Sequence, residues 1–342
     1  MLKKSPYEIS KARQIRVIID TDCACEADDQ FAVVHALITP KMDVRAVCAE
    51  HFCGKLSPRT AAETEAESYN EIKKLARLME LDEVNILHGC TETLPDDKTF
   101  VDSEASRFII EEALREDDRP LFVLCQGALT NLASAILQNP DIADKLVAIS
   151  IGGGTYPDGG YETNWCNDLV ATNVVLDSSV ELWQVPMNAY YSMHVNLSEL
   201  YQKVHCCGEI GAYLTENVFE NSREMFAQDA GSVDLSDLYT GGAKLSRGAA
   251  AVGGPSGESW NLGDQPCVGL LIRDHSAFFD VIGAPQIKDG VGDDFHSYIM
   301  SIGKYALRPD NPRKIRVYNF IDREFIMSDF YAKLSYQFGD EK

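Results

Sequence analysis

Short apolar runs rich in β-branched residues alternate along the chain with longer segments in which apolar positions recur every three or four residues. The first pattern is typical of buried strands, and the second is typical of helices that cover a sheet. Their alternation indicates parallel strands joined by helical crossovers. We therefore expect an α/β fold with an open, mostly parallel sheet flanked by helices, similar to a Rossmann fold.

Both kinds of segment can be assigned along the chain. The predicted strands are Ile15–Asp20, Val44–Glu50, Val84–His88, Leu121–Cys125, Leu146–Ile151, Glu181–Val185, Phe278–Ile282 and Ile315–Phe320. The predicted helices are Asp29–Ile38, a segment from Ser57 to Met79, Ser103–Arg115, Asn131–Leu137, Leu169–Leu176, Gly208–Ala227, Asp264–Ile272 and Asp322–Leu334. In the second helix, Ser57 is the expected cap and Pro58 the first helical residue.

One stretch, residues 228–263, interrupts this alternation. It is rich in Gly, Ser and Asp and has no sustained period of either kind. Loops of this length in compact domains are usually functional or disordered. Since no Pro-rich linker divides the chain, we expect a single domain over residues 1–342, with this insertion near its functional site. A separate small domain is the alternative.

Charge and cysteine content narrow the class of protein. The 342 residues include 31 Lys+Arg and 53 Asp+Glu, a formal net charge of -22, which disfavours binding to nucleic acids or anionic membranes. No apolar run approaches the roughly 18 residues of a membrane span, and Met1–Arg16 lacks the apolar core of a signal peptide. The ten cysteines form no C-x-x-C pair. We expect a cytoplasmic protein with free thiols.

Acidic residues crowd the end of the first predicted strand. Asp20 and Asp22 end the strand, and Asp28 and Asp29 open the next helix. Ligands of open α/β sheets bind at the carboxyl ends of the strands. Carboxylates this close repel one another, and a helix N-terminus offsets only part of the repulsion. A hard divalent cation such as calcium or magnesium would neutralise them.

Two other interpretations fit these acids. Asp22 could cap a turn, with Asp28 and Asp29 as solvated acids of the first helical turn. Alternatively, the Asp-x-Asp run could supply the nucleophile, Asp20, and the acid of a phosphatase that forms an aspartyl phosphate. The residues further along the chain weigh against the phosphatase.

Four further segments follow in order. They are Gly127-Ala-Leu129-Thr130-Asn131, the three glycines 152–154, Glu162-Thr-Asn164 with Asp168 six places after the glutamate, and Leu262-Gly263-Asp264-Gln265-Pro266. With the first acidic run, and with Ile321-Asp-Arg-Glu324 as a closing helix, the chain resembles the inosine-uridine-preferring nucleoside hydrolases over nearly its whole length.

The resemblance implies a site and an activity. It implies a calcium ion bound by Asp22, Asp29, Asp264 and the backbone carbonyl of Thr130. Asp28 would be the base that activates water, and Glu162 and Asn164 would bind the ribose hydroxyls. The implied reaction is hydrolysis of the N-glycosidic bond of a ribonucleoside or related ribosyl compound, as in purine or pyrimidine salvage. The family is commonly homo-oligomeric.

The implied chemistry is physically coherent. Breaking an N-glycosidic bond passes through an oxocarbenium-like state with positive charge on the sugar, which a carboxylate-lined pocket stabilises. The same negative field opposes phosphorylated sugars. The expected partner is therefore a small nucleoside or ribosyl compound, with no nucleic acid and no membrane.

The chain departs from the family pattern at several points, of which two bear most on the site. The loop between Asp22 and Asp28 is two residues longer, and Gly263 stands where many relatives have a histidine that protonates the leaving base. Candidates for that proton donor are His51, Tyr156, Tyr161, Trp260 and residues of the 228–263 insertion. Trp260 could also stack on a base as a substrate-binding residue. A binding relative with altered specificity, or without catalysis, is the alternative function.

Overall fold

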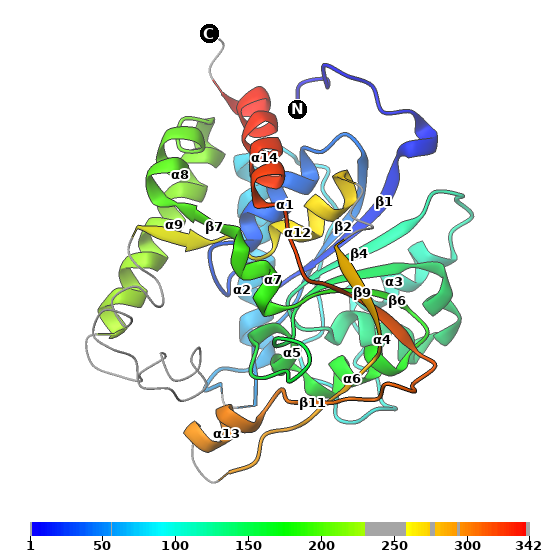
Figure 1. Ribbon diagram of the computed structural model, residues 1–342. Coiled ribbons are helices and arrows are strands. Elements are labelled where there is room, and N and C mark those ends of the chain that lie inside the picture. Colours follow the sequence, from blue (N-terminus) through cyan, green and yellow to red (C-terminus); the bar gives the residue numbers. More distant parts are fainter. Residues whose placement is uncertain (1, 56, 230–257, 274–277, 293–294, 340–342) are drawn as a thin grey trace.

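The computed structural model describes residues 2–55, 57–229, 258–273, 278–292 and 295–339. Within this part, a sheet of eight strands is covered by helices on both faces (Figure 1). The strands are β1 (Ile15–Thr21), β2 (Met42–Ala49), β3 (Ile86–Leu87), β4 (Leu121–Gln126), β5 (Val147–Ile151), β6 (Glu181–Val185), β9 (Phe279–Gly283) and β12 (Lys314–Tyr318). The expected α/β fold is confirmed.

The strand order is β3-β2-β1-β4-β5-β6-β12-β9, with parallel pairing everywhere except between β12 and β9. From β1 the chain builds outward through β2 and β3, and then returns to the other side of β1 to build β4, β5 and β6. The strand order therefore reverses between β1 and β4. In open α/β sheets, the crevice beyond the carboxyl ends of the strands at such a point is where ligands bind.

Two helical layers bury the two faces of the sheet. One layer contains α1 (Asp29–Leu37), α2 (Ala61–Leu78), α9 (Gly208–Asp229), α12 (Gln265–Ile272) and α14 (Arg323–Phe338), and the other contains α3 (Glu104–Leu114), α4 (Thr130–Gln138) and α6 (Leu169–Asp177). Because side chains alternate along a strand, Val17 and Ile19 pack with the first layer and Ile18 packs with the second. This two-sided burial explains why β1 is apolar almost throughout.

The structure also contains short helices and strands that the hydrophobic pattern of the sequence does not predict. They are the short helices α5 (Thr163–Asn167), α7 (Met187–Tyr190), α8 (Leu197–Lys203) and α13 (Phe295–Ser301), and the strands β7 (His194–Asn196), β8 (Ser259–Asn261), β10 (Gln286–Ile287) and β11 (Tyr305–Ala306). β7 pairs with β8 and β10 with β11, both antiparallel. Each is too short for hydrophobic periodicity to reveal. Residues 230–257 of the expected insertion lie outside the described residues, so the single-domain interpretation stays a prediction.

The predicted start of α2 at Ser57 and Pro58 is wrong. The helix begins at Ala61 with Thr60 as its cap. Thr60 Oγ1 accepts a hydrogen bond from Glu63 N at 3.2 Å, and the Glu63 carboxylate accepts one from Thr60 N at 2.8 Å. This reciprocal capping box satisfies two amide donors at once, whereas Ser57 has no Glu or Gln three residues later.

None of the described helices combines the length and the apolar composition that a membrane span needs.

Candidate active site

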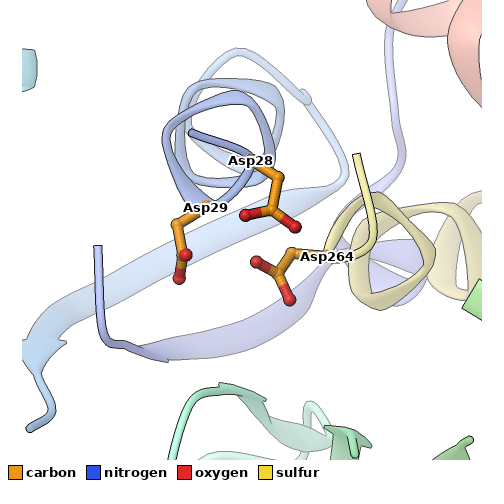
Figure 2. A group of neighbouring side chains, drawn as sticks. All are labelled: Asp28, Asp29 and Asp264. Carbon is orange, nitrogen blue, oxygen red and sulfur yellow. The ribbon is translucent and has the colours of Figure 1, made fainter. Parts of the chain in front are cut away.

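Three of the predicted carboxylates converge beyond the end of β1. Asp28 and Asp29 stand at the start of α1, and Asp264 precedes the first residue of α12. Figure 2 shows the three side chains pointing toward one another, and one carboxylate oxygen of each lies within 4.8 Å of the other two. The two helix N-termini offset part of their mutual repulsion. The structure thus brings together two distant parts of the chain: Gly263, the residue before Asp264, is 235 positions from Asp28.

Local hydrogen bonds fix these acids. The Thr21 hydroxyl at the end of β1 donates to Asp29 Oδ1, and Gly263 N donates to Asp28 Oδ2 at 3.0 Å. Asp22 is buried beside them, and its Oδ2 has no hydrogen-bond partner among the described residues. A Cβ on Gly127 would lie 2.9 Å from Asp22 Cβ and Cγ. The glycine of the Gly127–Asn131 segment is therefore what lets this backbone pack against Asp22.

The acids raise one another's proton affinity. Burial, followed by the charges of Asp29 and Asp28, raises the pKa of Asp22 well above its usual range. Burial and the neighbouring carboxylates act likewise on the pKa of Asp28 and of Asp264, and burial raises the pKa of Asp29 to about 7. Four carboxylates so placed do not ionise together without a compensating charge. The unpartnered oxygen of Asp22 and the all-oxygen donor set fit a hard divalent cation.

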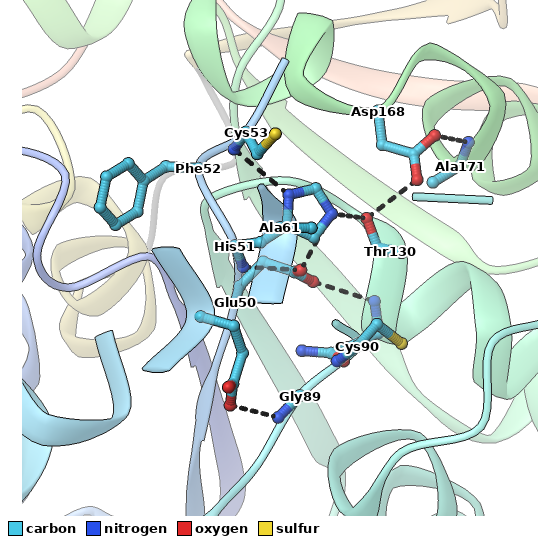
Figure 3. A network of polar contacts seen from close by, with 12 residues as sticks. Glu50, His51, Phe52, Cys53, Ala61, Gly89, Cys90, Thr130, Asp168 and Ala171 are labelled. Atoms are coloured by element: carbon cyan, nitrogen blue, oxygen red, sulfur yellow. Dashed lines mark hydrogen bonds and ion pairs between the residues drawn. The ribbon is translucent and has the colours of Figure 1, made fainter. Parts of the chain in front are cut away.

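Thr130, whose carbonyl is the fourth predicted metal ligand, is held through its side chain (Figure 3). His51 Nδ1 accepts from Cys53 N at 3.4 Å, so in the neutral ring Nε2 carries the proton and donates to Thr130 Oγ1 at 2.8 Å. Thr130 Oγ1 in turn donates to Asp168 Oδ2 at 3.0 Å. Burial lowers the pKa of His51 to about 4. His51 is therefore a neutral, buried support for Thr130 rather than a proton donor facing a substrate.

Glu50, which the sequence analysis assigned only to a strand end, sits in the same network. It is fully buried, and its two oxygens accept from His51 N at 3.0 Å and from Asn131 N at 2.9 Å. Burial and the charge of Asp20 raise its pKa well above the usual range. The sequence does contain a signal for Glu50, because an acidic residue directly after an apolar strand is placed at the edge of the sheet where ligands bind.

Glu162, predicted to bind ribose, caps α5 and accepts four hydrogen bonds. Its Oε2 accepts from Gly153 N at 2.6 Å and from Trp165 N at 3.1 Å. Its Oε1 accepts from Asn164 N at 3.2 Å and from the Tyr190 hydroxyl at 3.2 Å. Tyr190, at the end of α7, is a site residue that the sequence analysis missed, because an aromatic residue after a strand carries no motif.

The remaining predicted binding residues lie nearby on short elements. Asn164 Nδ2 donates to the carbonyl of Ile151, at the carboxyl end of β5, at 3.1 Å. Trp260 is buried on β8, opposite Val195 of β7, and its Nε1 has no hydrogen-bond partner among the described residues. Its role as a substrate-binding residue stays a prediction.

Position 263 has no room for a side chain. A Cβ on Gly263 would lie 2.8 Å from Asn261 Oδ1, 3.0 Å from Tyr190 Cδ2 and 3.3 Å from Asp28 Oδ2. A histidine in this place would need Tyr190 and Asn261 to move. Tyr190 therefore fills part of the space next to the position at which many relatives carry a histidine.

The fold and the acid cluster define an α/β protein with a carboxylate site at the point where the strand order reverses. The family model of the inosine-uridine preferring nucleoside hydrolases matches residues 17–277. The chain belongs to this family, and the resemblance inferred from its motifs is confirmed.

Individual relatives are distant. The pyrimidine-specific ribonucleoside hydrolase RihA of Salmonella typhimurium is 22% identical over 197 residues, which cover 52% of this chain and 63% of RihA. Two solved structures show the same fold. An inosine-guanosine nucleoside hydrolase is 18% identical with a TM-score of 0.63, covering 94% of this chain and 99% of the other. The type III effector protein XopQ, complexed with adenosine diphosphate ribose, is 14% identical with a TM-score of 0.62, covering 94% and 93%.

Proposed function

We propose that the protein is a metal-dependent N-glycosyl hydrolase that cleaves a ribonucleoside or related ribosyl compound into free base and sugar. The observation that carries the proposal is the convergence of Asp28, Asp29 and Asp264, with one carboxylate oxygen of each within 4.8 Å of the other two, in a chain of the nucleoside hydrolase family. Neither part suffices alone, because acidic clusters occur on many folds and a fold hosts many functions.

The metal proposed for this site is calcium. Its proposed ligands are Asp22, Asp29, Asp264 and the backbone carbonyl of Thr130. A bound calcium ion supplies Lewis-acid polarisation and orients water and the sugar hydroxyls. The hydrogen bonds on Thr130 Oγ1 from His51 and to Asp168 keep this residue in one orientation at the start of α4.

Asp28 is the proposed catalytic base. Gly263 N holds one of its oxygens, and burial with neighbouring charges raises its pKa. A carboxylate with raised proton affinity is a stronger base toward water once it is ionised. Glu162 and Asn164 are proposed to bind ribose hydroxyls, and the net negative site favours the oxocarbenium-like state of the sugar.

The proposed substrates are uncharged nucleosides rather than nucleotides, because the carboxylates repel phosphate. The matched relative RihA acts on pyrimidine ribonucleosides, and XopQ binds adenosine diphosphate ribose. Both purine and pyrimidine ribonucleosides should therefore be tested as substrates of this protein.

A second candidate is a ribosyl-binding protein with altered specificity or without hydrolysis. It is favoured by Gly263, which supplies no proton to a leaving base, and by the engagement of His51 in the buried network. The aspartyl-phosphate alternative is disfavoured because Asp20 is fully buried and accepts from Asn131 Nδ2 at 2.9 Å. A buried, bonded carboxylate is a poor nucleophile.

The test is release of free ribose from a panel of purine, pyrimidine and modified ribonucleosides, with calcium and after chelation. Asp28→Asn is expected to lower kcat by about 10² to 10⁴, the usual contribution of a general base. Asp97→Asn, at an exposed position, is the matched control. Equal rates in Asp28→Asn and wild type would overturn the mechanism. Intact ribose binding without release from any substrate would favour the second candidate.

The proposal extends to the protein's setting. We place it in the cytoplasm, in purine or pyrimidine salvage, as a homo-oligomer. All ten cysteines are free, which suits a reducing compartment.

A further inference from the structure

Glu162 has no acceptor position left for a substrate. An ionised carboxylate offers about four lone-pair positions, two on each oxygen. In this structure the protein itself fills them, with Gly153 N and Trp165 N on Oε2 and Asn164 N and the Tyr190 hydroxyl on Oε1. A ribose hydroxyl that donates to Glu162, as the proposed function requires, must therefore displace one of these four donors.

Tyr190 is the donor that can leave at least cost. The amides of Asn164 and Trp165 belong to the first turn of α5, so their removal from Glu162 would uncap that helix. Gly153 N lies at 2.6 Å in backbone fixed by the end of β5, since Met187 N donates to Gly153 O at 2.9 Å. Only the Tyr190 hydroxyl is carried by side-chain torsions, which can change while the backbone stays in place.

We propose that Tyr190 is a specificity-determining residue that competes with a ribose hydroxyl for Glu162 and turns away when the sugar binds. The inference rests on the proposed function, because it assumes that Glu162 binds ribose. The sugar must then offer a hydroxyl that replaces the phenol as donor. A ligand without that hydroxyl leaves Tyr190 in place.

The surroundings of Tyr190 are consistent with a turning ring on a fixed backbone. Asn261 Nδ2 donates to the Tyr190 carbonyl at 3.3 Å, which ties the backbone to β8. The ring edge borders Gly263, where even a single Cβ would lie 3.0 Å from Tyr190 Cδ2. Any residue other than glycine at position 263 would press on the ring and on Asp28 Oδ2, which would lie 3.3 Å from the same Cβ. The Tyr190 side chain thus borders Gly263 with its ring edge and Glu162 with its hydroxyl.

The first experiment compares KM and kcat for ribose release by wild type, Tyr190→Phe and the control Tyr201→Phe. Phenylalanine keeps the ring and removes only the competing hydroxyl. We expect the KM of Tyr190→Phe to fall about three- to tenfold, the scale of one hydrogen bond, with little change in kcat. Tyr201 is exposed on α8, and its variant should keep the wild-type KM. An unchanged or raised KM in Tyr190→Phe would overturn the inference and leave the proposed function standing.

Deoxyribonucleosides separate competition from a structural effect. The ribose hydroxyl that donates to Glu162 is identified by a double-mutant cycle: its removal from the substrate should raise KM in wild type and have a smaller effect on KM in Glu162→Gln. With the nucleoside that lacks this hydroxyl, Tyr190→Phe should lose its advantage over wild type, whereas a general loosening of the site would persist. Persistence of the advantage would contradict the competition.

Ribose binding measured by calorimetry covers the case in which wild type releases no ribose. Tighter ribose binding by Tyr190→Phe than by wild type would support the inference while the proposed hydrolysis fails. Equal binding, or no binding by either protein, would overturn the inference.

Discussion

Asn131 Nδ2 donates a hydrogen bond to Asp20 Oδ1 at 2.9 Å, although the two residues lie on different elements 111 positions apart. The backbone amide of Asn131 also donates to Glu50 Oε2 at 2.9 Å, and its side-chain oxygen accepts from Cys90 N at 2.7 Å. One residue at the start of α4 thus links the ends of β1 and β2. The network also separates two buried carboxylates, and burial raises the pKa of Asp20 to about 7.

We expect Asn131→Asp to destabilise the fold strongly at neutral pH. The change removes the amide donor and adds a third buried carboxylate between Asp20 and Glu50. Breaking such a network costs about 3 to 5 kcal/mol in the free energy of unfolding. Urea unfolding of the variant and of wild type measures this difference in the free energy of unfolding. The control is Asn319→Asp, where Nδ2 donates to Asp280 Oδ2 at 3.0 Å on the surface, and its cost should stay near 1 kcal/mol or less. Similar costs at both positions would contradict this account.

Gly127→Ala is expected to weaken metal binding by more than tenfold. The new Cβ would lie 2.9 Å from Asp22 Cβ and Cγ, so the Asp22 carboxylate must move from the position in which it is proposed to bind the metal. Metal sites tolerate displacements of only a few tenths of an ångström. Calcium titration by calorimetry measures the effect. Gly54→Ala is the control, because its closest neighbour is a side-chain oxygen, Asn167 Oδ1, at 3.2 Å. Equal calcium affinity in the two variants would refute the role of Gly127.

The sequence could predict the sheet and the acids near β1 because their signals are local. Each predicted strand lies within two residues of an observed one, since buried parallel strands are continuous apolar runs. Asp22, Asp28 and Asp29 are close in the chain, so their convergence follows from one strand, one loop and one helix start. Asp264 could be assigned to the site only through the family resemblance, because no local feature of the sequence indicates that α12 packs beside α1.

Contacts between distant short elements could not be predicted. The hydrogen bond from Tyr190 to Glu162 joins residues 28 positions apart, one at the end of the four-residue helix α7 and the other capping the five-residue helix α5. His51 meets Thr130 across 79 positions. The cap of α2 is a different case, because a local signal exists: Thr60 and Glu63 have the spacing of a capping box, whereas Ser57-Pro58 offers only a cap and a first helical residue.

Calcium is expected to stabilise the chelator-treated protein against heat. Binding relieves the repulsion among Asp28, Asp29 and Asp264, and a ligand at one hundred times its Kd adds about 2.7 kcal/mol. The readout is Tm as a function of calcium concentration. Asp264→Asn should lose most of this calcium-dependent rise, while Asp97→Asn at an exposed position should keep it. A full rise in Asp264→Asn would place the ion elsewhere, and a larger rise with magnesium would reverse the choice of metal.

His35 is expected to make the fold less stable as the pH falls from about 7 toward 5. It is fully buried on α1, with Nε2 2.8 Å from Asp329 Oδ2 and Nδ1 2.7 Å from Gln265 Oε1. Burial lowers the pKa of His35, and the charge of Lys333 beside Asp329 adds to this, although Asp329 opposes it. The unfolded chain therefore takes up a proton in this range that the native protein does not, so stability is present above the unfolded pKa and is lost as the pH falls.

The measurement is urea unfolding of wild type and His35→Gln across this range, both with chelator present. The buried carboxylates with raised pKa act in the opposite direction, because they hold protons in the native state and favour folding at lower pH. Their contribution is common to both proteins, so the difference between the two curves isolates His35. Wild type should lose stability relative to His35→Gln as the pH decreases. Parallel curves would show that His35 titrates alike in the folded and unfolded chains, and a divergence of opposite sign would show that Asp329 keeps it protonated in the native state.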